Sequence, residues 1–526
     1  MRGDGTARPV LVVGLDMGDS RLIARWAGQG QLPHLAALRA RGTWLDLEST
    51  AAILHTSAWP TFATGSSPGR HGVYYPYQPR PGHQQAQFIS PDQYGTPTFW
   101  TLADQARQRC LIYDVPETFP DPGFGGRAIF EWGTWAHYGA RMAQPSALLA
   151  ELKSRFGDYP LGLEAKRLGL GRPDRSDLEK RLIRSVAYKR DTAVWLLGAA
   201  SWDLAVIGFC ELHPAGHYLW PADAEVTERA NGTAFEPLRN VYVSIDQAIG
   251  ALIEEVSDEV IAVVVSGDGV RPNHCGWHLM PEVLRRLGHI RSPSASGDGE
   301  AAARGSLMGR FKQMVPPGAR RLIADNLPWW LRDRLGAHLQ SADIDWARTR
   351  AFALPTDLEG CIRINLKGRE PQGIVDPGRS YFDLCEQIRD ELLDLTNPAT
   401  GAAAVRQAHL RPQVFPGELG DHLPDIIVTW NDEAPLNGLT SARIGLVEEV
   451  SPDPRTGTHS SSGFLLAAGP GVAAGGRGQG HLLDVAPTVF QLLGLEPGRN
   501  TFEGRPLRAL TGGECSIPVP AHSLET

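Results

Sequence analysis

Two histidines and a glutamate lie within seven residues of each other, in the segment Glu211-Leu212-His213-Pro214-Ala215-Gly216-His217. Imidazole and carboxylate groups at this density are typical zinc ligands. If the segment is helical, the four-residue spacing places His213 and His217 on one face. Pro214 and Gly216 instead favour a loop or a first helical turn. A single histidine is usually structural, but two of them beside Glu211 favour a metal site.

Three further residues of metal-ligand type stand next to apolar runs. Asp16 follows the run at residues 10–15 and could ligate a cation or cap a helix. Asp268 stands in a Gly-Asp-Gly turn, where aspartate serves equally as a ligand or as a turn former. His459 lies in a glycine-flanked loop before another apolar run. These three residues are therefore candidate ligands, each with a structural alternative.

Hydroxyl side chains at residues 56 and 57 precede a predicted helix that ends near Gly65. A hydroxyl at a helix N-terminus suits a nucleophile, because the helix end stabilises an adjacent anion. The alternative is that Thr56 or Ser57 only caps the helix. On local grounds alone the capping interpretation is favoured.

Continuous apolar runs indicate the elements that must position these residues. Such runs are typical of buried parallel strands, and helical patterns separate them. The predicted strands are residues 10–15, 204–209, 260–265 and 425–429, and the clearest predicted helices are 182–197 and 242–255. This alternation predicts a doubly wound or related α/β sheet, whose ligands lie beyond the carboxyl ends of its strands. Asp16, Glu211 and Asp268 each follow a strand, so we expect them to converge.

Length and charge limit the possible functions. The chain has 526 residues, enough for one large α/β domain with insertions or for two domains. The formal net charge is −8, which disfavours the binding of long nucleic acids. A small anionic substrate would need a local positive centre, and in an acidic protein a metal ion commonly provides it.

We expect a cytoplasmic protein without a membrane span. The first nine residues are short and polar, unlike a signal peptide, and no stretch of about 18 apolar residues follows. The six cysteines are scattered without a CxxC pair, which favours reduced thiols over a disulfide framework.

Several motifs resemble, in their order, those of the alkaline phosphatase superfamily, and more narrowly its type I phosphodiesterase/nucleotide pyrophosphatase branch. They are Val-Val-Gly-Leu-Asp ending at Asp16, Leu-Pro-His-Leu at residues 32–35, Phe-Ala-Thr-Gly-Ser-Ser-Pro-Gly-Arg-His-Gly-Val-Tyr at 62–74, the segment 364–373, Gly-Thr-His ending at His459 with Gly-Pro-Gly at 469–471, Asp-Val-Ala-Pro-Thr at 484–488 and Gly-Arg-Pro-Leu at 504–507. The set spans nearly the whole chain and is specific as an ordered series.

This resemblance implies an alkaline phosphatase-like core with a largely parallel central sheet between helical layers. The core would occupy residues 1–280 and 346–512, with a linker and helical cap at 281–345 and a tail at 513–526. It implies a metal-dependent hydrolase of small phosphate mono- or diesters with a Thr or Ser nucleophile. A ligand-binding member without turnover and a phosphotransferase or phosphomutase on the same core are the alternatives.

The resemblance also implies two divalent ions, zinc in the first place and manganese as the alternative. One ion would be held by His217 and His459, with Glu211 or His213 as the third ligand. The other would be held by Asp16 and Asp268, beside the nucleophile.

The chain departs from the family pattern at three places. The nucleophile usually stands ten residues before the glycine of the Thr-Gly element, and here that position is His55. A shift of one residue gives Thr56, which we favour, with Ser57 second. His213 stands where the family's DxxxH ligand pair has aspartate. The family's Ser-Asp-His-Gly reads Ser-Gly-Asp-Gly at residues 266–269, so the second metal site is altered.

Overall fold

The computed structural model describes residues 8–84, 86–89, 94–133, 141–161, 174–221, 233–293, 344–449, 451 and 453–511. The chain divides into two compact units. Unit 1 comprises Met1–Ser67, Thr96–Pro272 and Pro454–Thr526, and unit 2 comprises Pro68–Gly95 and Asn273–Asp453. The division expected from the sequence instead assigned all of residues 346–512 to the second part of one core. Most of the expected cap, residues 294–343, and the tail lie outside the described residues.

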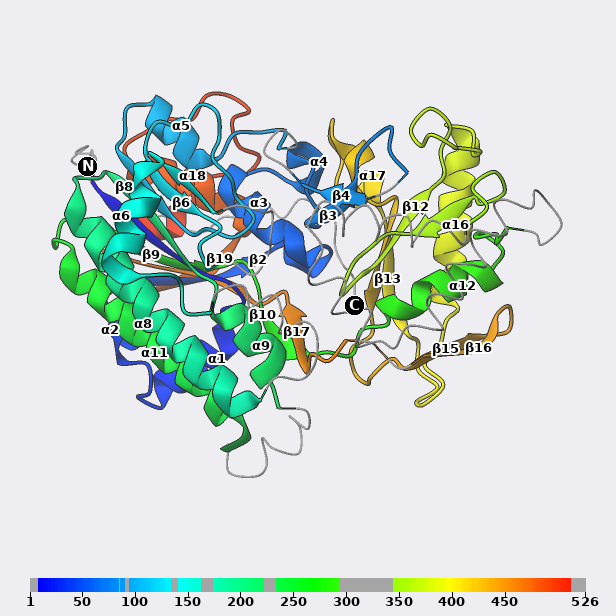
Figure 1. Cartoon of the computed structure of the whole chain (residues 1–526), viewed down its shortest axis with the longest axis horizontal. Coiled ribbons are helices and arrows are strands. Elements are labelled where there is room, and N and C mark those ends of the chain that lie inside the picture. Colours follow the sequence, from blue (N-terminus) through cyan, green and yellow to red (C-terminus); the bar gives the residue numbers. More distant parts are fainter. Residues whose placement is uncertain are drawn as a thin grey trace. The chain divides into compact units, whose positions relative to one another are not determined.

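Unit 1 is built on a large central sheet (Figure 1). Its strand order within the described residues is β19 (Gly476–His481), β2 (Thr43–Glu48), β18 (Gly463–Ala468), β9 (Ile261–Ser266), β1 (Val10–Leu15), β8 (Leu204–Phe209), β5 (Cys110–Tyr113), β6 (Arg127–Phe130) and β7 (Met142–Gln144). The strands from β9 to β6 run parallel, whereas β18 and β7 run antiparallel to their neighbours. The predicted α/β class with a largely parallel sheet is therefore confirmed.

The apolar runs form the middle of this sheet because both of its faces are covered. All six residues of β1, β8 and β9 are buried. Successive side chains of a strand point to opposite faces. Accordingly, Leu11 and Val13 of β1 join one hydrophobic cluster, while Val10 and Val12 join another. The predicted strands 10–15 and 204–209 match β1 and β8, and 260–265 matches β9 with a shift of one residue.

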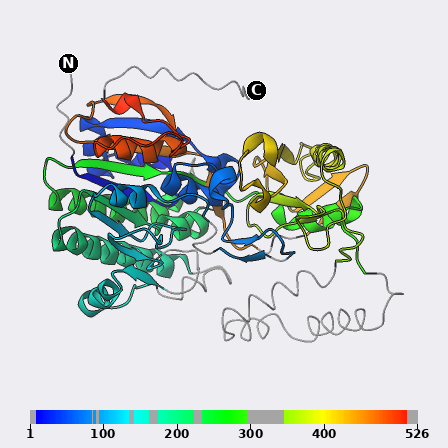
Figure 2. The same cartoon turned by 90° about the horizontal axis from the view of Figure 1, so that it is seen from above.

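Helices cover both faces of the sheet, as the two views show (Figures 1 and 2). One layer contains α1 (Ser20–Gly28), α2 (Pro33–Arg41), α6 (Ala147–Phe156), α8 (Arg175–Ala199), α9 (Leu212–Leu219) and α11 (Glu236–Glu255). The other contains α3 (Ala58–Thr64), α5 (Phe99–Gln105) and α18 (Val485–Leu492). The helices predicted at 182–197 and 242–255 lie within α8 and α11, so both predictions are confirmed.

Unit 2 contains a separate antiparallel sheet, with the order β11 (Ala351–Ala353), β12 (Gly360–Ile364), β14 (Ile426–Trp430) and β13 (Val405–Leu410). Its other elements are α4 (Pro68–His71), β3 (Tyr77–Pro79), β4 (Ala86–Phe88), α12 (Met280–Arg286), α16 (Arg379–Leu393), α17 (Arg411–Val414), β15 (Gly438–Ser441) and β16 (Gly445–Glu448). The run predicted as a parallel strand at 425–429 is β14, so its predicted direction was wrong. An apolar run reports burial on both faces but not the direction of the neighbouring strands.

The segment 364–373, one of the family-like motifs, forms a buried ion network in unit 2. Arg369 Nη2 lies 2.6 Å from Asp425 Oδ2, and Arg369 Nε lies 2.9 Å from Glu370 Oε1. Arg363 Nε contacts the same glutamate oxygen at 2.6 Å. Buried charges are tolerated when they are paired in this way. The segment therefore has a structural role in unit 2.

No helix within the described ranges is both long and apolar enough to cross a membrane. The described cysteines are free and buried; they are Cys110, Cys210, Cys275, Cys361 and Cys385. The cytoplasmic location stays a prediction.

Candidate metal centre and active site

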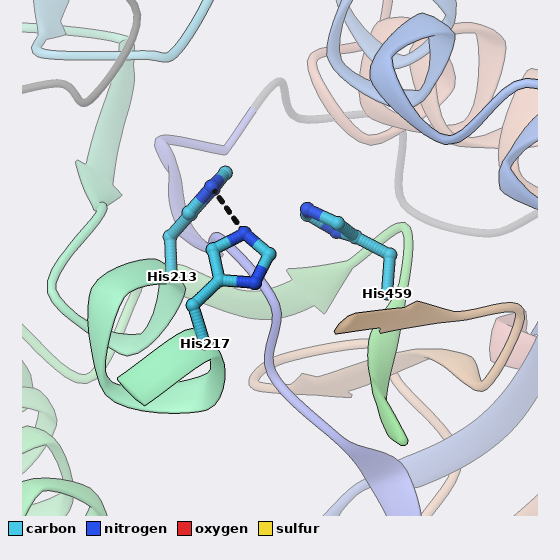
Figure 3. A group of neighbouring side chains, drawn as sticks. All are labelled: His213, His217 and His459. Atoms are coloured by element: carbon cyan, nitrogen blue, oxygen red, sulfur yellow. Dashed lines mark hydrogen bonds between the residues drawn. The ribbon is translucent and has the colours of Figure 1, made fainter. Parts of the chain in front are cut away.

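Helix α9 places two of the candidate ligands side by side. It begins at Leu212, directly beyond the carboxyl end of β8, so the four-residue spacing puts His213 and His217 on one face. Their Nε2 atoms lie 3.0 Å apart (Figure 3). The side chain of His217 is fully buried. The segment is helical over eight residues, although Pro214 and Gly216 had favoured a loop or a first helical turn.

The third histidine comes from a distant part of the chain. Strand β17 (Gly457–Ser460) pairs antiparallel with β10 (Gly269–Pro272), in a register that sets His459 opposite Val270. The His459 ring centroid lies 4.9 Å from that of His213 and 5.0 Å from that of His217. Among the residues that the structure describes, these three histidines form the one group of His, Cys, Asp or Glu side chains whose ligand atoms all lie within 4.8 Å of one another.

Each of the three imidazoles has its Nδ1 atom next to an acceptor. His213 Nδ1 lies 2.9 Å from Asp16 Oδ2, and His217 Nδ1 lies 2.9 Å from the carbonyl oxygen of Gly457. His459 Nδ1 lies 2.5 Å from Asp268 Oδ2. The carbonyl of Gly457 and an ionised carboxylate at Asp16 only accept, so the Nδ1 atoms of His217 and His213 donate. The Nε2 atom then carries a lone pair, which is the form of histidine that binds a metal.

Asp16 is fixed by the end of the sheet. Its backbone N–H donates to the carbonyl of Phe209, which extends the pairing of β1 with β8 by one residue. Its Oδ1 accepts a 2.9 Å hydrogen bond from Trp59 Nε1 on α3. Burial raises the pKa of Asp16, but the charge and hydrogen bond of His213 and the Trp59 bond outweigh it, so the pKa lies below its usual range. The carboxylate is therefore ionised.

Asp268 lies in the turn between β9 and β10, next to the turn that contains Asp16. Its Oδ1 accepts a 3.1 Å hydrogen bond from the backbone N–H of Met17. Ser266 Oγ ties the two turns further, since it donates to the carbonyl of Leu15 at 2.6 Å. Burial and the charge of Asp16 raise the pKa of Asp268 to about 8. A cation bound nearby would favour the ionised carboxylate.

The Glu211 side chain points into a buried cluster of charged groups and is not part of the three-histidine group. Its Oε1 accepts a 2.7 Å hydrogen bond from Tyr159 OH and lies 3.4 Å from Lys189 Nζ. Lys189, on α8, also pairs with Asp114 Oδ2 at 2.7 Å, and both side chains are fully buried. Burial lowers the pKa of Lys189, but Asp114 and other neighbours raise it well above its usual value. The lysine is therefore charged.

The three positions considered for the nucleophile differ in their surroundings. Ser57 is fully buried, and its Oγ donates to the carbonyl of Leu54 at 2.6 Å. Thr56 is half-buried, and its Oγ1 lies 2.9 Å from His55 Nε2. The ring of His55 lies beside His459, with a centroid distance of 4.5 Å. The Thr56 hydroxyl is thus linked through His55 to the edge of the histidine group.

Three residues that lie near this site were not identified from the sequence. Arg455 Nη1 lies 3.5 Å from His217 Nε2, and Trp59 holds Asp16. Glu117 is buried, and burial together with the charge of Asp16 raises its pKa well above the usual value. Of the three, only Arg455 could have been noticed in the sequence, because a basic residue stands there four positions before His459. His274 and His278, which follow Asp268 in the sequence, lie in unit 2, and each has a ring nitrogen within hydrogen-bond distance of a backbone carbonyl oxygen.

The sequence model of the type I phosphodiesterase/nucleotide pyrophosphatase family matches residues 10–436. The chain belongs to this family. It is a phosphoric ester hydrolase of the phosphodiesterase/pyrophosphatase type. The matched region includes Asp16, His213, His217 and Asp268 but ends before His459.

Solved structures of low sequence identity are similar to this chain. Phosphonoacetate hydrolase from Sinorhizobium meliloti 1021, in complex with phosphonoformate, is 12% identical, with 93% of this chain and 95% of that chain covered and a TM-score of 0.50. Murine ectonucleotide pyrophosphatase/phosphodiesterase 5 is 12% identical, with 93% and 96% covered and a TM-score of 0.45. No curated protein matches the sequence significantly. The predicted alkaline phosphatase-like fold is confirmed.

Proposed function

We propose that this hydrolase cleaves a small phosphate mono- or diester with a divalent cation held by His213, His217 and His459, and with Thr56 as its nucleophile. One observation carries the proposal. The Nε2 atoms of His213 and His217 face each other across 3.0 Å, while their Nδ1 protons are committed to Asp16 and to Gly457. Two lone pairs at this distance repel unless a shared cation or proton lies between them.

The three histidines fit a zinc ion. On a tetrahedral ion with Zn–N bonds of about 2.0–2.1 Å, two imidazole nitrogens stand roughly 3.3 Å apart. Burial, followed by the charge of Arg455, lowers the pKa of His217 well below its usual value, so this imidazole is neutral, as a ligand must be. An imidazole set favours zinc over manganese, which prefers oxygen ligands. A bound cation supplies Lewis acidity toward a phosphoryl oxygen.

Thr56 suits the nucleophile better than its neighbour. The hydroxyl of Ser57 is committed to the carbonyl of Leu54, whereas that of Thr56 meets an imidazole nitrogen that can accept its proton. Thr56 Oγ1 would bond to phosphorus as the ester oxygen departs, and water would then cleave the threonine–phosphate bond. His55 would orient the attacking hydroxyl through its Nε2 atom.

Arg455 provides the positive side chain that a phosphate needs. It is half-buried, and its guanidinium lies next to His217. Guanidinium groups match phosphate oxygens in charge and in geometry. Together with the net charge of −8, this local charge supports a small phosphate ester as substrate rather than a nucleic acid polymer.

Hydrolysis of bis(p-nitrophenyl) phosphate and p-nitrophenyl phosphate by zinc-loaded protein tests the proposal. We expect His217→Ala to lower kcat/KM by at least about 100-fold and to reduce bound zinc, because even residues that only support a metal ligand change affinity or activity by about 10–100-fold. The matched control is His83→Ala, which removes an exposed histidine of unit 2. Equal turnover by the two variants would contradict the proposal.

A further inference from the structure

We infer that this chain binds one catalytic cation rather than the pair implied by the family resemblance, and that Asp16 and Asp268 act as hydrogen-bond acceptors for the histidine ligands. The inference rests on the three-histidine site of the proposed function. It assigns the two aspartates as positioning residues, each of which fixes one imidazole. The reasons are the hydrogen bonds that the two aspartates already accept and the surroundings of Gly267.

Each oxygen of the two carboxylates already accepts a hydrogen bond. Asp16 accepts from Trp59 Nε1 on one oxygen and from His213 Nδ1 on the other, both at 2.9 Å. Asp268 accepts from the N–H of Met17 at 3.1 Å and pairs with His459 Nδ1 at 2.5 Å. A second cation would have to share these oxygens with the donors that already hold them in place.

The two aspartate–histidine pairs have a role of their own. A histidine that ligates a metal commonly donates its other ring N–H to a carboxylate or carbonyl, which fixes the tautomer and the ring orientation. His213 and His459 do so to the aspartates, and His217 does so to Gly457. Drawing the carboxylates toward a second ion would leave buried N–H groups without acceptors, at a cost of about 1–3 kcal/mol each.

The position that would supply a further ligand has no side chain, and the atoms nearest to it are apolar. Gly267 stands where the family-like Ser-Asp-His-Gly motif has its aspartate. A Cβ atom at this position would lie 2.9 Å from Leu482 Cδ2 and 3.2 Å from Ala58 Cβ. Residue 267 therefore borders an apolar part of the core. A cation site that depends on a carboxylate there is not formed by this chain.

Zinc stoichiometry and zinc K-edge X-ray absorption of the full chain test the inference. Protein stripped with a chelator and saturated with zinc should contain one zinc per chain, bound by three imidazoles, without the metal–metal distance of about 3.5–4 Å that two-metal sites show. Two zinc ions per chain with such a distance would overturn the inference and leave the proposed function intact. Absence of bound zinc would overturn both.

Zinc affinity of an aspartate variant separates a supporting residue from a ligand. We expect Asp16→Asn to weaken zinc binding by about 10–100-fold in competition with a chromophoric chelator, while the stoichiometry at saturation stays at one. The matched control is Asp46→Asn, since Asp46 is exposed and also accepts from a tryptophan Nε1, that of Trp44, at 2.9 Å. A wild-type value of two that falls to one in Asp16→Asn would make Asp16 a ligand of a second ion and refute the inference.

Discussion

Thr56→Ala is expected to lower kcat by about 10³-fold or more, because loss of the nucleophile removes the covalent route and leaves only the stabilisation supplied by the rest of the site. The Thr56 hydroxyl bonds to His55 Nε2 rather than to one of the three histidines proposed as zinc ligands. Zinc content and the unfolding transition should therefore stay close to wild-type values. Steady-state hydrolysis of a p-nitrophenyl phosphodiester, with elemental analysis of the same samples, measures both.

Ser57→Ala is the matched control for this experiment. Its hydroxyl donates to the carbonyl of Leu54 inside the fold, so its loss should cost about 1 kcal/mol of stability and change kcat by less than about threefold. The opposite pattern, with Ser57→Ala inactive and Thr56→Ala active, would assign the nucleophile to Ser57. Full activity in both variants would leave His55 as the nucleophile and contradict the role of Thr56.

Lys189→Met is expected to lower the free energy of unfolding by about 3–5 kcal/mol. The change removes the cation that lies between Asp114, at 2.7 Å, and Glu211, at 3.4 Å, where all three side chains are fully buried. The two carboxylates would then face each other without a compensating charge. Urea denaturation followed by circular dichroism measures the loss.

An exposed lysine of the same unit provides the control for Lys189. Lys153 pairs with Asp158 at 3.2 Å, but its side chain is 43% exposed and that of the aspartate 70% exposed. Solvent screens such a pair, so Lys153→Met should cost no more than about 1 kcal/mol. If the two variants lost the same small amount, the buried cluster would not stabilise unit 1 as described.

The sequence predicts the centre of unit 1 well, because its signals there are local. Continuous apolar runs mark β1, β8 and β9, and side chains directly after them lie at one edge of a parallel sheet. The positions of Asp16 and Asp268 follow from this rule. The pairing of His213 with His217 follows from helical spacing, but Pro214 and Gly216 had favoured a loop or a first helical turn for that segment. Each of these inferences needs only neighbouring residues and the periodicity of one element.

What the sequence misses depends on contacts between distant segments. The register of β17 against β10 sets His459 beside Asp268, and nothing local to either strand encodes it. Glu211 follows a strand, as a ligand would, yet it bonds to Tyr159 and faces Lys189, which from the sequence looks like an ordinary helix-surface lysine. The antiparallel sheet of unit 2 was missed for a related reason, since a buried strand has the same composition in either direction.

Removal and return of zinc test the central claim most directly. The hydrolysis rate of a p-nitrophenyl phosphodiester would be followed in protein stripped with a chelator, and then during stepwise addition of zinc. If the three histidines hold a catalytic cation, activity should fall to background in the stripped protein and return with added zinc in the wild type but not in His217→Ala. Stripped, zinc-free protein that hydrolyses the ester at the full rate would contradict the account.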